Sequence, residues 1–308
     1  MITTRKTDYL FKATLFLTFA ALMALPEDAL AWGIGAHMDI AKKTASSLFG
    51  CLGQNSYAAA AVKHFGAFLA GSLAPDMFVL KDWFLKPSKV ILHNWELAHR
   101  LLRNAREDEE VAFGLGYVSH LSSDVICHNF FIPQYIFMWD HRLKFTHVFA
   151  ETQVEGHLGK TFEADRINMI MRESRCLNSF FVRTAGLDRK TFERNRVLIG
   201  KAISFKQKTG IDGSVLRWSA NNGKDFIERA DEHLRLSLEL SVQAVKNPFN
   251  SNALRYCPEG EMRINLSRLR RKASMKVKKP EAFRKEREAG KYNYIHRVPR
   301  HLVTEPVL

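Results

Sequence analysis

From Trp32 to about Asn247, apolar residues recur at intervals of three and four positions along this 308-residue chain. Ile40, Thr44 and Leu48 follow this spacing near the beginning of the region. Such intervals place side chains on one face of an α-helix, and no stretch shows the alternation that a half-buried strand requires. The sequence therefore predicts an all-α fold with a single multi-helix domain.

The expected helices are separated by glycine, proline and polar residues. They cover residues 36–49, 57–71, 89–105, 108–128, 133–158, 163–175, 188–206 and 222–246. Breaks are expected at 71–76, Pro87, Gly186, 210–213 and Pro248. With 46% apolar residues the chain can bury one large core, which excludes a disordered protein; with only 4 Cys it is not a small disulfide-framed protein.

The first 31 residues have the character of a secretory signal. Basic residues precede an apolar run at 13–25, and the small residues Ala29 and Ala31 frame a cleavage site. An uncleaved membrane anchor is the alternative, but the run is shorter than the roughly twenty residues that span a bilayer. We therefore expect a secreted or periplasmic protein that begins at Trp32, after cleavage following Ala31.

The net charge of +14 is unevenly distributed. From Met262 to the end there are 14 Lys and Arg residues against 4 Asp and Glu residues. We expect a helical domain at 32–260 and a basic tail at 261–308. The tail can contact anionic lipids or nucleic acid, or it is a solvated surface segment. Tyr292 and Tyr294 are too few aromatic residues for a base-stacking platform.

The strongest chemical signal lies in residues 108–128, where His120, Asp124 and His128 are spaced by four positions. At about 100° per residue, these side chains fall within about 80° of arc, with steps of about 6 Å along the helix. A single histidine on such a face is more often a hydrogen-bonded core residue. Three donors in register favour a metal site instead.

Other donors repeat this spacing or stand at helix boundaries. His147 and Glu151 have the i,i+4 spacing that lets two side chains bind one cation. Asp76 alone can be a helix cap, and His93 alone can be a surface residue. His99 is the one substitute for His93. The other histidines have no partner in the pattern.

The expected N-terminus adds a further set of donors. In a chain that begins at Trp32, the free α-amine and the Trp32 carbonyl can chelate one metal ion in a five-membered ring, and His37 follows closely. Only a processed chain offers this amine. The cleavage site and the position of His37 therefore support each other.

In their order along the chain, these donors resemble the zinc-dependent phospholipase C superfamily. That superfamily includes bacterial phosphatidylcholine-hydrolysing phospholipases, the catalytic domain of glycosylphosphatidylinositol-specific phospholipase D and the single-strand zinc nucleases. The resemblance covers Trp32 to about Glu155, and only helical character is shared beyond it. The matching residues are Trp32, His37, Asp76, His93, His120, Asp124, His128, His147 and Glu151.

The resemblance implies up to three zinc ions in a cleft between helices. The implied ligands are Asp76, His93, His120 and Asp124 for the first ion; His128, His147 and Glu151 for the second; and Trp32 and His37 for the third, with Asp124 bridging. Mixed histidine and carboxylate ligands with positions open to water are typical of catalytic zinc.

One spacing departs from part of the superfamily. The bacterial phosphatidylcholine enzymes and the nucleases separate the aspartate from the next histidine by five residues, usually including a proline, whereas three residues separate Asp124 from His128. The spacing here is more similar to the glycosylphosphatidylinositol-specific branch, and the helix is expected to stay unbroken. It weakens any transfer of a phosphatidylcholine preference.

The resemblance implies hydrolysis of phosphodiester bonds, with a phospholipase C acting on phospholipid head groups at a membrane surface through a zinc-bound hydroxide as the first choice. Asp76 is the implied general base on the attacking water. Three zinc ions would outweigh the carboxylates of Asp76, Asp124 and Glu151, so the site should prefer an anionic substrate. Aromatic residues between Asp76 and His93 and after His128 can contact acyl chains or pack in the core.

Two alternatives stay open. A single-strand nuclease or nucleotidase of the same superfamily is favoured by the net charge of +14 and disfavoured by the spacing of Asp124 and His128, so nucleic acid is the less favoured substrate. A secreted protein that binds zinc or anionic surfaces without catalysis is the other. Of the cysteines, Cys127 is expected to be buried, and the other three can pair with one left over.

Overall fold

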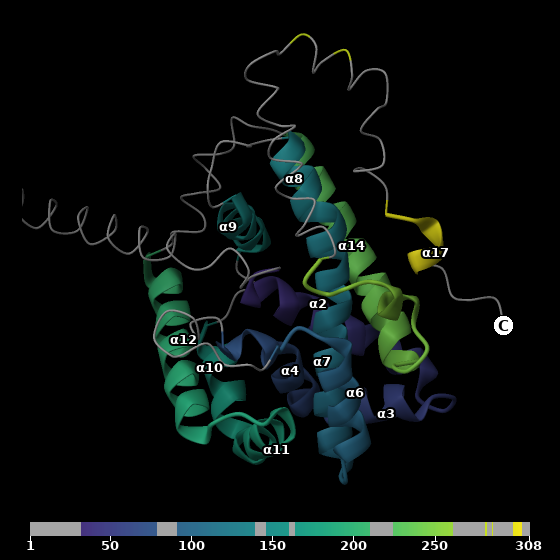
Figure 1. Ribbon diagram of the computed structural model, residues 1–308, viewed down its shortest axis with the longest axis vertical. Coiled ribbons are helices and arrows are strands. Elements are labelled where there is room, and N and C mark those ends of the chain that lie inside the picture. The colour runs from purple at the N-terminus through teal and green to yellow at the C-terminus, as the bar shows by residue number, and fades with distance from the viewer. Residues whose placement is uncertain are drawn as a thin grey trace, which may run out of the picture.

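The computed structural model describes residues 32–78, 91–138, 146–159, 164–209, 224–260 and 298–303, together with Glu281 and Lys285 (Figure 1). Within these ranges every regular element is a helix, which confirms the all-α prediction. None of the helices in this part of the chain has both the length and the apolar character needed to cross a membrane.

Several expectations lie outside the described residues. They are the signal at 1–31, the aromatic segment at 79–90 and most of the basic tail at 261–308. The side chain of His147 is also outside the description, although its backbone belongs to α9 (Thr146–Leu158).

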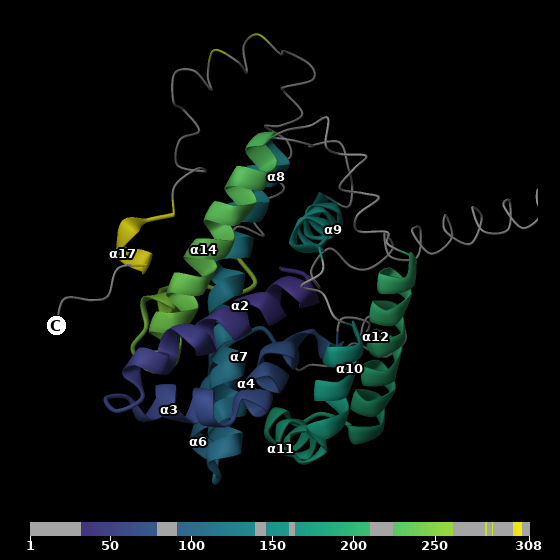
Figure 2. The ribbon, with the colours of Figure 1, turned by 180° about the vertical axis from the view of Figure 1, so that it is seen from behind.

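The fold is organised around α7 (Asp108–Ile126), which runs through the middle of the molecule (Figure 1). Packed against it are α4 (Phe65–Leu73), α6 (Trp95–Asn104) and α14 (Lys224–Lys246). From behind, α2 (Ile34–Leu48) crosses the group and contacts α4 and α14 (Figure 2). Every α7 residue beyond its first turn and a half is buried, so polar side chains on α7 point into the protein.

Two glycines allow α4 and α7 to approach closely. A Cβ atom added at Gly71 would lie 1.9 Å from the carbonyl oxygen of Phe113, and one at Gly116 would lie 1.9 Å from that of Phe68. Only glycine leaves room for such contact between two helix backbones. The expected break at 71–76 is present at Ala74, because α4 continues through Gly71 to Leu73 and Gly71 serves a helix crossing.

The predicted helix at 57–71 is divided in two. The break is at His64, whose backbone angles, φ −108° and ψ 52°, are outside the helical range. α3 (Ser56–Lys63) precedes it, and its N-terminus is capped by Asn55, whose side chain accepts a hydrogen bond from the backbone of Ala58. Short 3-10 helices follow α2 and α4, η1 (Phe49–Cys51) and η2 (Pro75–Phe78).

The end of α7 is wound as a π-helix over Cys127–Phe131 and then becomes α8 (Ile132–Met138). The backbone N–H of Ile132 bonds to the carbonyl of Cys127, five residues earlier. Pro133 follows directly, and a proline in an ordinary α-helix would clash with the preceding turn. The wider π-turn accommodates Pro133. The helix therefore continues through residues 129–132, where the sequence predicted a gap between two helices.

A second group of helices covers one side of the central bundle: α10 (Ala164–Glu173), α11 (Arg175–Ala185) and α12 (Arg189–Thr209) (Figures 1 and 2). The expected helices leave residues 176–187 unassigned, so α11 is a helix that the sequence did not predict. It ends at Gly186, which has φ +69° and caps the helix in the left-handed conformation.

Two aromatic clusters fill the core. Phe113, Phe180 and Phe181 join α7 to α11 at ring separations of 5.8 to 6.2 Å. Trp32 and Phe131 stack at 4.8 Å in the other, beside α14. All four cysteines are free, and Cys127 is fully buried as expected.

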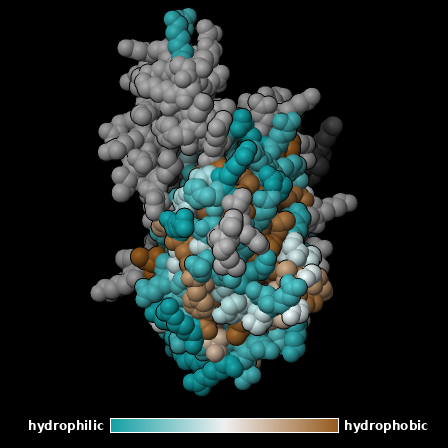
Figure 3. All heavy atoms as spheres, turned by 90° about the vertical axis from the view of Figure 1, so that its right-hand side faces the viewer, coloured by the Kyte–Doolittle hydropathy of each residue, from teal (hydrophilic) through white to brown (hydrophobic). Residues whose placement is uncertain are grey.

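The C-terminal part of the description consists of η6 (Asn252–Arg255) and α17 (Arg300–Val303), which both pack against α14. Figure 3 shows this side of the molecule, where apolar residues are scattered among hydrophilic ones. Isolated apolar side chains of this kind are normal for a protein surface.

Candidate metal centre

Five of the nine predicted donors meet in the middle of the bundle. His37 comes from the first turn of α2, Asp76 from η2, His93 from the residues before α6, and His120 and Asp124 from α7. Four of these side chains are at most 2% exposed, and His93 is partly exposed at 15%. Elements that are far apart in the sequence thus deliver donors to one buried volume.

Asp124 lies at the centre of the cluster. Its Oδ1 is 3.2 Å from Nε2 of His37, and its Oδ2 is 3.1 Å from Nε2 of His120 and 3.6 Å from Nε2 of His93. The two carboxylate oxygens therefore face different histidines. This is the arrangement that a carboxylate bridging two metal ions requires.

Asp76 closes the cluster from the η2 side. Its Oδ1 lies 3.4 Å from Nε2 of His93 and 3.8 Å from Nε2 of His120, and its Oδ2 lies 4.0 Å from Nε2 of His37. Two overlapping groups have all their donor atoms within 4.8 Å of one another: His37, Asp76 and His120, and His93, His120 and Asp124. Each group is compact enough to hold one cation.

The carboxylates of this cluster fit a bound cation. Within the described residues, the carboxylate oxygens of Asp76 and Asp124 face histidine nitrogens and meet no other hydrogen-bond donor. Burying ionised oxygens without hydrogen bonds is costly unless a positive charge compensates. Imidazole and carboxylate groups are common ligands of Zn²⁺, so the donor set suits this ion.

The histidines shape the charge of Asp124. Burial by itself would raise the pKa of Asp124, but the nearby His120 and His37 outweigh this effect and hold the pKa well below its usual value. The carboxyl group is therefore ionised and can act as a ligand.

Neighbouring groups orient the donors. Nδ1 of His120 lies 2.8 Å from the carbonyl oxygen of Ser72, so Nδ1 carries the proton and Nε2 is left to bind a metal. Nδ1 of His37 lies 3.0 Å from the hydroxyl of Ser123. The hydroxyl of Tyr117 donates to the carbonyl of Leu92 at 2.5 Å and so holds the residue before His93.

Burial and the charges of Asp76 and Asp124 raise the pKa of Tyr117 well above its usual value. The phenol therefore stays protonated and keeps its hydrogen bond to the segment that carries His93.

Trp32 is fixed beside the cluster. Its indole N–H donates to the carbonyl of Ser123 and to the hydroxyl of Ser237, both at 3.1 Å, and its side chain is fully buried. Next to it, Oε1 of Glu155 accepts hydrogen bonds from the backbone N–H groups of Gly35 and Ala36 at 2.8 and 3.1 Å. Glu155 thereby accepts hydrogen bonds from two backbone N–H groups of the first turn of α2 that have no partner within the helix. These bonds fix the position of the first turn of α2.

Two of the three expected ligands of the second ion, His128 and Glu151, have described side chains. His128 lies in the π-helix and is partly buried, and Glu151 on α9 is 5% exposed. Burial, and then the charges of Asp124 and Glu151, raise the pKa of the Cys127 thiol well above its usual value. Ala150, the neighbour of Glu151 in the chain, belongs to the same buried cluster as Cys127 and Phe131, so this part of α9 lies beside the π-helix. Cys127 is a buried neutral thiol.

His99, the possible substitute for His93, lies elsewhere. Its Nε2 is 3.0 Å from the carbonyl oxygen of Pro248, and its ring packs on Phe249. His93 is the histidine that reaches the cluster.

Sequence reasoning missed the groups that orient the ligands: Ser72, Tyr117, Ser123, Glu155 and Ser237. Only Glu155 left a local signal, because it follows Glu151 by one helical turn on α9. The others act through contacts between helices and have no spacing of their own.

Comparison with known proteins gives one match. The family model for zinc-dependent phospholipase C matches residues 36–191, which include eight of the nine predicted donors. No curated protein and no solved structure matches the chain. The match covers half of the chain, and together with the buried histidine and aspartate cluster it shows that this chain belongs to the zinc-dependent phospholipase C family.

Proposed function

We propose that this protein is a secreted phospholipase C that hydrolyses the phosphodiester bond of phospholipid head groups. The observation that carries the proposal is the buried cluster around Asp124, in which the carboxylate oxygens of Asp76 and Asp124 face three histidines and meet no other donor among the described residues. The family supports a zinc-dependent phospholipase C-like hydrolase with a phospholipid substrate.

The proposed ligands of two of the ions include the five donors whose mutual distances the structure gives. Asp76, His93, His120 and Asp124 are proposed to hold one zinc ion. His37 is proposed to bind another ion together with the amine and carbonyl of Trp32, with Asp124 bridging. His128, His147 and Glu151 complete the proposal as ligands of a third ion. When bound, the ions supply Lewis-acid polarisation of the phosphoryl group and lower the pKa of an attacking water.

The residues of the chain position the reaction. Asp76 is proposed as the general base, because it is a buried carboxylate with both oxygens aimed into the cluster. His93 is the most exposed of the five clustered donors, so a substrate phosphate would approach from its side. Tyr117 supports that side through its hydrogen bond to the carbonyl of Leu92.

The direct test is turnover by the zinc-loaded chain that begins at Trp32. We would assay phosphatidylcholine and phosphatidylinositol in mixed micelles beside single-stranded DNA, with His120→Ala and Asp124→Asn as inactive controls. Release of diacylglycerol that both substitutions abolish supports the proposal. Turnover of DNA alone would assign the protein to the nuclease branch, and full lipid turnover after thorough chelation would contradict a zinc-dependent mechanism.

The proposed export has its own test. Sequencing the N-terminus of the protein recovered from the periplasm or the medium should give Trp32 as the first residue. Retention of one extra residue before Trp32 should lower the zinc content by one ion, because an internal amide nitrogen does not replace the free amine. An unchanged zinc content would remove Trp32 from the ligand set.

A nuclease activity is the second candidate, and one observation favours it. α12 carries seven Lys and Arg residues and one acidic residue, Glu193, in a protein with a net charge of +14. Basic helices of this kind bind polyanions in general. The DNA arm of the assay decides between the two substrates.

A further inference from the structure

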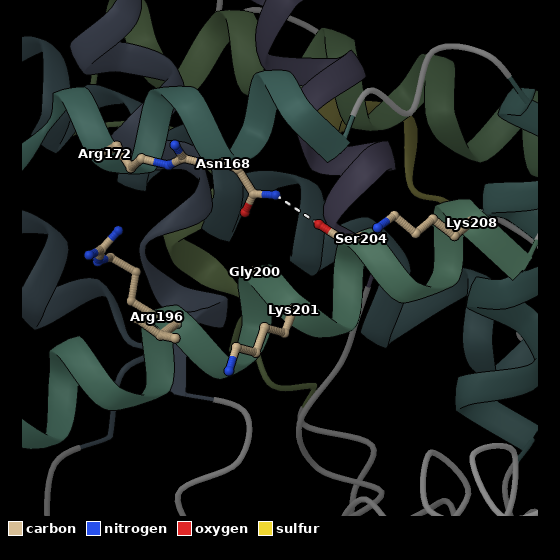
Figure 4. A pocket seen from close by; sticks show the side chains of 8 residues that line it. Asn168, Arg172, Arg196, Gly200, Lys201, Ser204 and Lys208 are labelled. Carbon is tan, nitrogen blue, oxygen red and sulfur yellow. Dashed lines mark hydrogen bonds between the residues drawn. The ribbon is translucent and has the colours of Figure 1, made fainter. Parts of the chain in front are cut away.

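An open groove lies between α10 and α12, apart from the metal centre. It has a volume of about 440 Å³. Four of its lining residues are cationic, Arg172 on α10 and Arg196, Lys201 and Lys208 on α12 (Figure 4). Figure 4 shows the two arginines at one end of the groove and Lys208 at the other.

Asn168 of α10 and Ser204 of α12 are joined by a hydrogen bond across the groove. The side-chain amide of Asn168 donates to the hydroxyl oxygen of Ser204 at 3.1 Å (Figure 4). A Cβ atom added at Gly200 would lie 2.6 Å from Oδ1 of Asn168, so the Asn168 side chain occupies the space that glycine leaves on α12. Since the Ser204 hydroxyl accepts that bond, its own hydrogen is available to donate to a ligand in the groove.

The cations of the groove are weakly neutralised. Arg196 pairs with Glu193 at 2.8 Å, and no ion pair joins Arg172, Lys201 or Lys208 to another residue in the described part of the chain. Like charges gathered along one groove raise the local potential and attract anions.

The charge continues along the exposed edge of α12. Lys190, Arg194, Val197, Lys201 and Lys208 recur at helical spacing on one stripe, and all five are exposed. Val197 is 47% exposed, as is Met169, which follows Asn168 on α10. A row of cations with exposed apolar side chains matches the interface of an anionic membrane, where head groups lie above the acyl chains.

α12 also packs against η2, the element that carries Asp76. A membrane surface bound by α12 would therefore lie one helix contact away from the element that carries Asp76. The expected basic tail at 261–308 is a separate segment of the chain. The groove would therefore be a second surface for an anionic partner.

We propose that the groove between α10 and α12 binds phosphate groups of anionic lipids and docks the protein on a membrane surface. Arg172, Lys201 and Lys208 bind the phosphate oxygens, the hydroxyl of Ser204 donates to them, and Val197 enters the interface. This role is separate from the proposed hydrolysis, because it needs no zinc and no bond cleavage.

The test is sedimentation of the zinc-loaded chain, with its tail, on vesicles of phosphatidylcholine with and without phosphatidylserine. Lys201→Gln/Lys208→Gln should weaken binding to the anionic vesicles by roughly 25-fold, since each basic residue near such a surface contributes about a fivefold change. Arg106→Gln/Arg255→Gln is the matched control, because it removes two exposed cations from other parts of the chain. It should change binding much less.

Equal binding by the groove variant and the control variant would overturn the proposal, as would preference of the groove for single-stranded DNA over anionic vesicles in direct competition. Thermal melts of both variants check that the helices are intact. Lipid turnover is measured separately in the mixed-micelle assay with phosphatidylcholine and phosphatidylinositol. A protein that binds anionic vesicles but is inactive in that assay refutes the proposed function and leaves the groove supported.

Discussion

At the scale of single residues, we expect the candidate metal centre to depend on residues outside the ligand set, such as Gly33 and Glu155. Gly33 packs directly against Glu155, and a Cβ atom at this position would lie 2.4 Å from Oε1 of Glu155. Gly33→Ala should therefore displace the carboxylate from the N-terminus of α2 and lower the stability of the protein by about 1–3 kcal/mol. Urea unfolding measures this loss. Gly50→Ala is the control, because a Cβ atom there meets nothing within 4 Å, and an equal loss in both variants would contradict the role of Glu155.

Asp188 gives a prediction on pH. Its Oδ2 accepts a hydrogen bond from the backbone N–H of Thr191 at 2.8 Å, at the start of α12. This bond lowers the pKa of Asp188, so the folded protein holds the proton less tightly than the unfolded chain. Its contribution to stability is present above the ordinary pKa of about 3.9 and is lost as the pH falls through the lowered value.

Asp188→Ala should accordingly lower the midpoint of thermal unfolding at neutral pH and have no effect at a pH below the lowered pKa. Asp188→Asn is the matched variant, because asparagine also caps helices. It should recover most of the loss at neutral pH. A deficit of Asp188→Ala that persists in strong acid would show that the carboxylate is not the cause.

At the scale of elements, the contact between α4 and α7 sets the distance between Asp76 and the α7 donors. Gly116→Ala would bring a Cβ atom to 1.9 Å from the backbone oxygen of Phe68, and a backbone atom cannot move aside as a side chain can. We expect a loss of about 3 kcal/mol or more in unfolding free energy, together with reduced zinc affinity. Gly66→Ala on α4 meets nothing within 4 Å and should instead add up to about 1 kcal/mol. A stable, zinc-binding Gly116→Ala protein would contradict this account.

The sequence predicts local relations well and relations between elements poorly. His120 and Asp124 are one turn apart on a single helix, so their spacing alone places them together. Asp76 and His93 were assigned only through the family pattern, because no local rule connects η2 with α7. Gly71 was interpreted as a break for the same reason: a glycine at a helix crossing and a glycine at a helix end are the same letter, and only the position of Phe113 distinguishes them.

At the scale of the whole molecule, we expect metal binding to contribute to folding, because the buried carboxylates of Asp76 and Asp124 meet no donor other than histidine among the described residues. Zinc that binds only the folded state stabilises it by mass action, by about 2.7 kcal/mol at a free concentration of 100 times the dissociation constant. Thorough chelation should therefore lower the unfolding midpoint of the entire domain in one transition, since α2, η2 and α7 all contribute donors. Two separate transitions would show that the centre does not join these elements.

Asp76→Asn sharpens this prediction, because its effect should depend on the metal. Without zinc, an amide avoids burying a carboxylate that has no hydrogen-bond partner among the described residues, so the variant should be at least as stable as the native protein. With saturating zinc, the variant should gain less from the metal and become the less stable of the two. Asp39→Asn is the control: Asp39 is also buried but pairs with Lys43 at 2.7 Å, so its loss should act equally with and without zinc. Parallel behaviour of Asp76→Asn and Asp39→Asn would mean that Asp76 stabilises the fold without binding metal.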